Sequence, residues 1–253
     1  MQLSRETRNV GLLSLCQALG QTQMVLVFSV SSIIGASIAP NVGWATVPIT
    51  FQFVFMTMST IPAAFLMKRI GRANGFTVFL IIGCAGAALM IYALFLQNFA
   101  LFCAGSALFG ASAGANQQFR FAAVDAASDE FRSKAVSLVL AGGVFAAITG
   151  PSLSSWGYDM ISPIIYGGVY LVILSMQVIM MVLLRFTDIP PPSEQERTGH
   201  VRPMREIAAQ PAFIVALLSA MIGYGVMNFV MLSTPIFMHL HPTHPFGQLD
   251  INN

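Results

Sequence analysis

The fold is decided by residues 44–97, which read WATVPITFQFVFMTMSTIPAAFLM (44–67), KRIGRANG (68–75) and FTVFLIIGCAGAALMIYALFLQ (76–97). Each apolar run reaches the roughly 20 residues that a helix needs to cross a bilayer. The whole chain is 56% hydrophobic and 9% charged, with a mean hydropathy of +0.74. Soluble chains carry about a quarter charged residues. The sequence therefore predicts an all-α polytopic membrane protein embedded in a lipid bilayer.

Further apolar runs of this length lie on both sides of the stretch at 44–97. Together they predict seven transmembrane helices, because each run is long enough to span and contains few charged side chains. The predicted spans lie at about 10–36, 44–67, 76–97, 99–122, 135–157, 163–186 and 207–238.

The positive charges predict the direction of these helices. All 12 lysines and arginines fall in the N-terminal tail or near the second, fourth and sixth linkers. The other linkers, 40–43, 97–98 and 158–162, contain none. Because cytoplasmic loops are enriched in lysine and arginine, the N-terminus is predicted to be cytoplasmic. The expected location is the inner (plasma) membrane, with multiple passes.

A long polar linker predicts the domain organisation. Residues 187–206 contain three consecutive prolines and several charged side chains, a composition typical of a flexible tether. The predicted domains are an N-terminal six-helix bundle at 1–186, a cytoplasmic linker at 187–206, the first helix of an incomplete second bundle at 207–238, and a disordered tail at 239–253.

The basic cluster between the second and third spans resembles a known signature. Residues 66–72 are similar to the loop Gly-x-Leu-Ala-Asp-Arg-x-Gly-Arg-Arg of the major facilitator superfamily (MFS), although Lys68 replaces its aspartate and Ala73 its second arginine. Topology anchoring alone would also account for such a cluster. The resemblance implies that the loop holds one conformation of the protein. The predicted gating residues here are Lys68, Arg69, Gly71 and Arg72.

A second resemblance lies in the fifth span. The superfamily's antiporter-type motif reads Gly-x-x-x-Gly-Pro-x-x-Gly-Gly, and this chain has Gly150 and Pro151 with small residues at the other positions. Small residues let helices approach closely, and proline bends a helix, so simple close packing is also compatible with the pattern. Gly150 and Pro151 are predicted conformational residues.

The resemblance implies a bundle of inverted three-helix repeats that works by alternating access around a site near the bilayer midplane. Superfamily members normally have 12 spans, so the chain is expected to be truncated after about seven transmembrane helices. In the superfamily the first helix of each triplet lines the central cavity. The resemblance therefore assigns the cavity to the first, fourth and seventh predicted spans.

Polar side chains on those three spans, with the apolar side chains that continue the same face of the first span, are the candidate binding residues. Along the first span they recur every three or four residues, which places them on one helix face. Hydrogen bonding between helices is the alternative use of such amides. The pattern favours a neutral or zwitterionic organic solute with polar edges and an apolar body. The predicted substrate-binding residues are Gln17, Gln21, Met24, Phe28, Asn116, Tyr224 and Asn228.

The remaining charged and metal-binding side chains predict no catalytic site. Every aspartate and glutamate maps to a linker or helix end, and no nucleophile or metalloprotease motif is present. Arg120 is expected to reach the cytoplasmic surface or to pair with Asp125. Three histidines at 239–244 have suitable chemistry for zinc or copper, but their proline-rich surroundings favour a disordered tail. No enzyme activity, metal, cofactor or nucleic acid partner is predicted.

These observations together predict secondary active or facilitative transport of a small organic solute by alternating access. The alternative is a truncated, non-transporting membrane fragment, or a half-carrier that needs pairing with another transporter half. Uptake of labelled solutes separates these two readings.

Overall fold

The computed structural model describes residues 2–128, 130–161, 165–189, 206 and 208–240. By its internal contacts the chain divides into two units, Met1–Pro191 and Pro192–Asn253. Most of the predicted linker, 187–206, and all but the first two residues of the predicted tail, 239–253, lie outside the described residues. The predicted domain boundaries therefore stay predictions.

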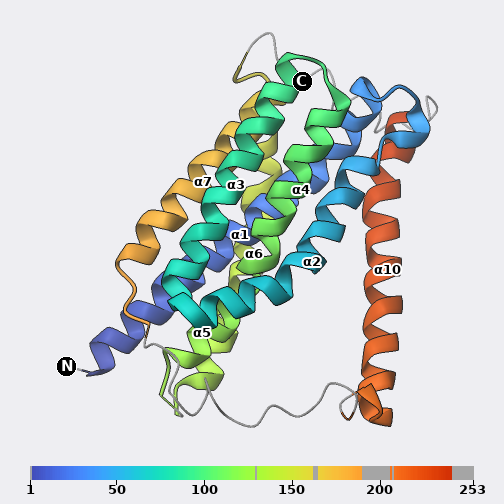
Figure 1. The fold of residues 1–253 in the computed structure, drawn as a ribbon. Coiled ribbons are helices and arrows are strands. Elements are labelled where there is room, and N and C mark those ends of the chain that lie inside the picture. Colours follow the sequence, from blue (N-terminus) through green and yellow to red (C-terminus); the bar gives the residue numbers. More distant parts are fainter. Residues whose placement is uncertain (1, 129, 162–164, 190–205, 207, 241–253) are drawn as a thin grey trace. The chain divides into compact units, whose positions relative to one another are not determined.

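The described residues form helices and no strand, which confirms the predicted all-α fold. Seven helical segments within them are long and apolar enough to cross a membrane. The first unit contains α1 (Gln2–Ile38), the 3-10 helix η1 (Val42–Trp44), α2 (Val47–Ile70), α3 (Arg72–Phe95), α4 (Phe99–Asn116), α5 (Phe119–Asp125), α6 (Arg132–Gly157) and α7 (Gly167–Arg185) (Figure 1). The second unit contains α10 (Pro211–Leu240).

The fourth predicted span differs from the structure. The sequence predicts one helix at 99–122, but the chain breaks between α4 and α5 at Gln117 and Gln118. The Gln118 side chain donates a hydrogen bond to the carbonyl oxygen of Thr60 in α2, at 3.1 Å. The backbone N–H of the same residue turns to the carbonyl of Ala115 at 2.9 Å. These bonds hold the break against the neighbouring helix.

The turn between α3 and α4 is tight. Gln97 has a φ of 51°, and its side chain donates to the carbonyl oxygen of Leu94 at 2.9 Å. The Asn98 side chain then accepts the backbone N–H of Leu101 at 3.0 Å and caps α4. An asparagine at this position satisfies one of the unpaired N–H groups at the start of a helix.

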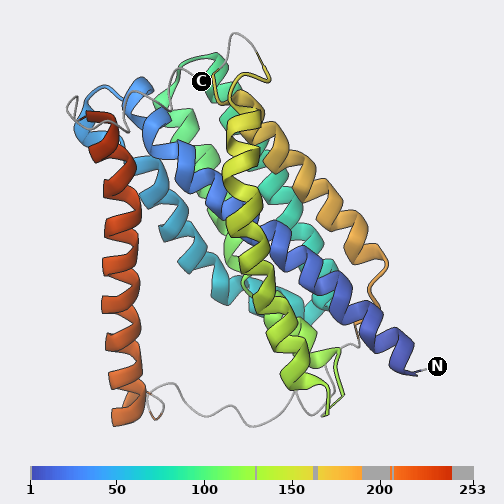
Figure 2. The ribbon, with the colours of Figure 1, turned by 180° about the vertical axis from the view of Figure 1, so that it is seen from behind.

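Close backbone approaches hold the bundle together. In the first unit α2 packs along α4, α3 contacts α4 and α7, and α6 packs along α1, where it crosses α1 as seen from behind (Figure 2). A Cβ atom on Gly110 would collide with the backbone of Gln52, and one on Gly114 would collide with Met56 and Ser59. These glycines let the α2 and α4 backbones meet, as small residues commonly do between membrane helices.

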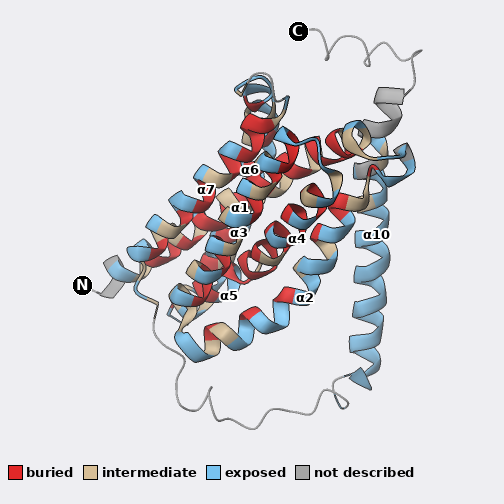
Figure 3. Ribbon diagram, turned by 45° about the horizontal axis from the view of Figure 1, so that its top comes forward, coloured by how far each residue is buried: buried red, intermediate tan, exposed pale blue. Residues whose placement is uncertain are grey.

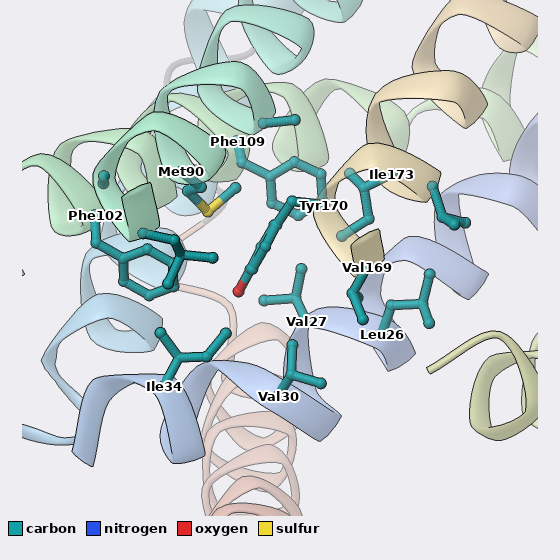
Figure 4. Close-up of a cluster of buried hydrophobic side chains, with 14 of the residues drawn as sticks. Leu26, Val27, Val30, Ile34, Met90, Phe102, Phe109, Val169, Tyr170 and Ile173 are labelled. Atoms are coloured by element: carbon teal, nitrogen blue, oxygen red, sulfur yellow. The ribbon is translucent and has the colours of Figure 1, made fainter. Parts of the chain in front are cut away.

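The buried residues follow α1 and α4, whereas most of α2 and α6 is exposed (Figure 3). One cluster of buried side chains surrounds Tyr170, whose ring meets that of Phe102 edge-on at 5.7 Å (Figure 4). The Tyr170 hydroxyl and the Ser31 hydroxyl form a buried hydrogen bond of 3.0 Å. A second cluster centres on the stacked rings of Phe76 and Phe119, 4.2 Å apart.

Candidate functional site

A small pocket lies between α1 and α4, with room for about one water molecule in this structure. These are the first helices of the two triplets in the first unit, and their polar side chains meet here. The lining residues are Gln17, Gly20, Gln21, Gln23, Met24, Phe109, Ala113, Asn116 and Gln117.

Four of the predicted binding residues come together in this pocket. Gln17, Gln21 and Met24 contribute from α1, and Asn116 contributes from the end of α4. Phe28 is not among the lining residues; its ring centroid lies 5.6 Å from that of Phe53 in α2. The structure thus gathers most of the predicted face of α1, while the binding role of each residue stays a prediction.

Two amide oxygens beside the pocket are buried without a hydrogen-bond partner. They are Oε1 of Gln17 and Oδ1 of Asn116, in side chains that are 6% and 7% exposed. Gly20 lines the pocket beside Asn116, since a Cβ on Gly20 would lie 3.7 Å from the Cβ of Asn116. An unsatisfied buried polar group costs about 1–3 kcal/mol. These oxygens are therefore suited to accept donors from a solute or from water.

A fully buried pair of glutamines lies next to the pocket, and neither is among the predicted binding residues. Nε2 of Gln177 in α7 donates to Oε1 of Gln23 in α1 at 3.1 Å, and both side chains are 0% exposed. Gln177 is the one amide in the apolar sixth span. That isolation is the signal that marks it, because an amide in an apolar helix needs a partner.

Another missed residue is Gln52, the one amide in α2. Its side chain is 1% exposed, and its Nε2 donates to the sulfur of Met24 at 3.3 Å. Nε2 of Gln23 similarly donates to the sulfur of Met180 at 3.5 Å. Thioether sulfur is a weak acceptor, so both amides make bonds that a better acceptor can replace.

The predicted gating loop between α2 and α3 contains an ion pair. Arg72 pairs with Asp125 at the end of α5, with side chains that are 22% and 41% exposed. Gly71 has a φ of 88° and a ψ of 156°, a conformation that glycine adopts without strain. Lys68 and Arg69 occupy the last turn of α2, where cations favour the helix dipole.

The expected pairing of Arg120 with Asp125 is wrong. The Arg120 side chain is exposed, and its guanidinium carbon lies 4.9 Å from the ring centroid of Phe121. Residues five apart on a helix do not share a face, whereas those three or four apart do. Asp125 therefore turns to Arg72 across the bundle.

The predicted conformational residues in the fifth span lie in α6. Gly150 is buried, and a Cβ there would collide with the side chain of Val25 in α1, while Pro151 is exposed. Gly142, two turns earlier in α6, also lies close to α1. A Cβ on Gly142 would lie 3.0 Å from the backbone of Ala18. Both glycines thus lie where α6 packs on the helix that lines the pocket.

The other two predicted binding residues are in the second unit. Tyr224 in α10 is 61% exposed, and Nδ2 of Asn228 donates to its carbonyl oxygen at 2.8 Å. This bond lies within one helix and is common for asparagine. The participation of Tyr224 and Asn228 in binding stays a prediction. The histidines at 241 and 244 lie outside the described residues.

Comparison with known families decides what this bundle is. The sequence profile of the Major Facilitator Superfamily matches residues 10–246. The chain belongs to the major facilitator superfamily. It is accordingly a multi-pass membrane protein of a transporter family, with seven candidate membrane helices in its described residues.

The chain is also similar to individual curated members of the superfamily. It is 32% identical over 238 residues to "Riboflavin transporter RfnT" of Brucella anthropi, covering 92% of this chain and 59% of that protein. It is 24% identical over 268 residues to "Uncharacterized MFS-type transporter YdeG" of Bacillus subtilis, covering 99% of this chain and 61% of that protein. The chain thus spans about three fifths of the length of these relatives. The printed names of both relatives are those of transporters.

Proposed function

We propose that this chain forms the solute-binding bundle of a secondary carrier that moves a neutral, planar heteroaromatic solute of the flavin class across the membrane by alternating access. The observation that carries the proposal is the pair of unpartnered amide oxygens, on Gln17 and Asn116, beside one pocket. The name of the Brucella relative supplies the solute class.

The chemistry of the lining fits such a solute, whose entry requires α1 and α4 to open beyond the small space of this structure. Amides donate and accept, so they match the alternating carbonyl and N–H groups of a flavin's pyrimidine edge. Met24 and Phe109 supply apolar surface for a ring system. The lining residues include no charged side chain. This composition favours a neutral solute over an inorganic ion, which requires convergent charges.

The gating role proposed for the loop between α2 and α3 rests on its ion pair. Arg72 and Asp125 connect the start of the third span to the end of the fourth, so a change in their spacing breaks the pair. We further propose the cytoplasmic side of the inner membrane for this loop and for the N-terminus, because lysines and arginines gather there. Gly150 and Pro151 complete the proposed conformational set.

Uptake of radiolabelled riboflavin tests the proposal. The host is a bacterial strain that neither synthesises nor imports riboflavin, expressing either this chain or an empty vector. We expect saturable uptake with the chain, lost in Gln17→Leu and retained in Gln118→Leu. Gln118 is the matched control, because it is a buried amide of the same bundle that bonds the Thr60 carbonyl outside the pocket.

Two outcomes would contradict the proposed function. Uptake equal to the empty vector, with the protein present in the membrane, would remove the flavin assignment. Equal loss in Gln17→Leu and Gln118→Leu, at equal abundance, would show that the pocket amides act only in packing.

A further inference from the structure

Two glutamines beside the pocket donate amide hydrogen bonds to methionine sulfur atoms. Nε2 of Gln52 lies 3.3 Å from the sulfur of Met24, and Nε2 of Gln23 lies 3.5 Å from the sulfur of Met180. Sulfur accepts hydrogen bonds more weakly than a carbonyl oxygen does. A carbonyl brought into the pocket would therefore compete well for these donors.

Gln52 is the more informative of the two, because it does not line the pocket. Its side chain is 1% exposed, and its Oε1 is buried with no hydrogen-bond partner. The residue that it bonds, Met24, does line the pocket. The thioether thus lies between the solute space and an amide that lacks one of its bonds.

The backbone at Gln52 has no room to move toward α4. A Cβ on Gly110 would meet the backbone of Gln52, so the two helices already touch at this level. Met24 has three rotatable side-chain bonds and adapts its shape readily. Rotation of the Met24 side chain is therefore the motion that connects Gln52 with the pocket.

We propose that Gln52 is a solute-binding residue that the Met24 thioether covers in the empty pocket. When a solute enters, Met24 turns aside, and the Gln52 amide donates from Nε2 to a solute carbonyl and accepts an adjacent solute N–H at Oε1. This two-point pattern selects a cyclic amide or imide edge. The inference rests on the proposed function, because it assigns one edge of the solute in the same pocket.

The exchange predicts an unusual sign for one substitution. Met24→Leu preserves side-chain volume but removes the sulfur acceptor. The substitution therefore destabilises the empty state, in which Gln52 donates to this sulfur. It does not affect the bound state, in which Gln52 donates to the solute instead. Riboflavin affinity should rise about two- to fivefold, the factor that corresponds to one weak hydrogen bond. If Met24 only contacted the solute, its substitution would lower riboflavin affinity instead of raising it.

The test measures riboflavin binding to the purified 253-residue chain in lipid nanodiscs by flavin fluorescence anisotropy. We expect tighter binding for Met24→Leu and weaker binding for Gln52→Leu. In the Gln52→Leu background, Met24→Leu should no longer tighten binding, because the donor that it frees is absent. This double-mutant cycle isolates the exchange from general packing effects.

Met90→Leu is the matched control. Its sulfur also accepts a hydrogen bond, from Ser106 at 3.6 Å, but neither residue lines the pocket. Ser106 keeps its second bond, to the Phe102 carbonyl at 2.9 Å, when the sulfur is removed. Riboflavin affinity should be unchanged. A rise equal to that of Met24→Leu would contradict the proposal, since it would then reflect loss of sulfur anywhere in the bundle.

The imide edge is tested with riboflavin methylated at N3, which lacks the N–H proposed to reach Gln52. Methylation should weaken binding to the parent chain and weaken it much less in Gln52→Leu. Equal weakening in both overturns the assignment of this edge. Unchanged or weaker binding in Met24→Leu overturns the covering role of Met24. If the parent chain binds no riboflavin, the proposed function fails and this inference fails with it.

Discussion

Buried amides in this bundle differ in whether they bond a neighbouring helix. Gln118 and Gln177 each donate to an oxygen acceptor on a neighbouring helix, the Thr60 carbonyl and Oε1 of Gln23, although Oε1 of Gln177 itself has no partner. Gln17 and Asn116 lie beside a pocket, and their oxygens have no partner. The first group joins helices. The second leaves bonding capacity that a solute can use.

The difference shows how to separate packing from binding in a membrane bundle. Burying an unpaired amide in an apolar environment is costly, so an amide that serves only packing is expected to bond at least one group on a neighbouring helix, as Gln177 does through its donor. An orphaned acceptor beside a pocket is therefore stronger evidence for a site than the presence of the amide itself. Substitutions at the two groups should produce opposite phenotypes.

The largest expected effect is on the paired group, from Gly83→Val in α3. A Cβ at this position would lie 2.5 Å from Nε2 of Gln177 and 2.6 Å from Oγ of Ser112, and neither side chain has free space to retreat. Overpacking of this kind costs about 1–3 kcal/mol. A clear fall in thermal stability of the purified protein is expected. Wild-type stability would show that the packing around Gln177 is loose.

A smaller effect is expected from Gln177→Leu. The change removes the donor for Oε1 of Gln23, which is then buried without a partner and costs about 1–3 kcal/mol of stability. This cost is partly offset by the added apolar surface and by loss of the unpartnered Oε1 of Gln177. Thermal unfolding compared with Gln177→Asn and wild type measures it. If the leucine variant is more stable than wild type, the pair does not join α1 and α7, and its polarity has another role.

The smallest effect is expected at the cytoplasmic loop, from Arg72→Gln. Arg72 and Asp125 are partly exposed, and such pairs contribute about 0–1 kcal/mol to stability. Thermal stability should therefore change little, whereas the transport rate should fall if the pair holds one conformation. Unaltered uptake would remove the gating role of this pair, leaving the loop as a topology anchor.

The spans could be predicted from sequence because hydropathy and length alone determine them. The break between α4 and α5 could not, because it depends on the bond from Gln118 to the carbonyl of Thr60, a residue far away in the chain. The pairing of Arg72 with Asp125 was missed for the same reason. Sequence proximity suggested Arg120 instead, although that residue does not share a helix face with Asp125.

The pocket was predictable to the extent that helical spacing determines a face. The spacing of Gln17, Gln21 and Met24 along α1 predicts a shared face, and all three line the pocket. It also included Phe28, which packs on Phe53, because periodicity does not show how far along a helix a pocket extends. Gln52 escaped detection because a single amide has no periodicity, and its importance depends on which residue of another helix it meets.

The central claim is that the unpartnered amide oxygens beside the pocket, on Gln17 and Asn116, bind solute, whereas Gln118 and Gln177 join helices through their donors. It is tested most directly by measuring riboflavin affinity and thermal stability together, for Gln17→Leu and Gln118→Leu of the same chain. Gln17→Leu should lose about 1–3 kcal/mol of binding free energy and keep its stability, because its oxygen has no internal partner. Gln118→Leu should lose stability and keep its affinity. The reverse pattern, or equal changes in both variants, would contradict the account.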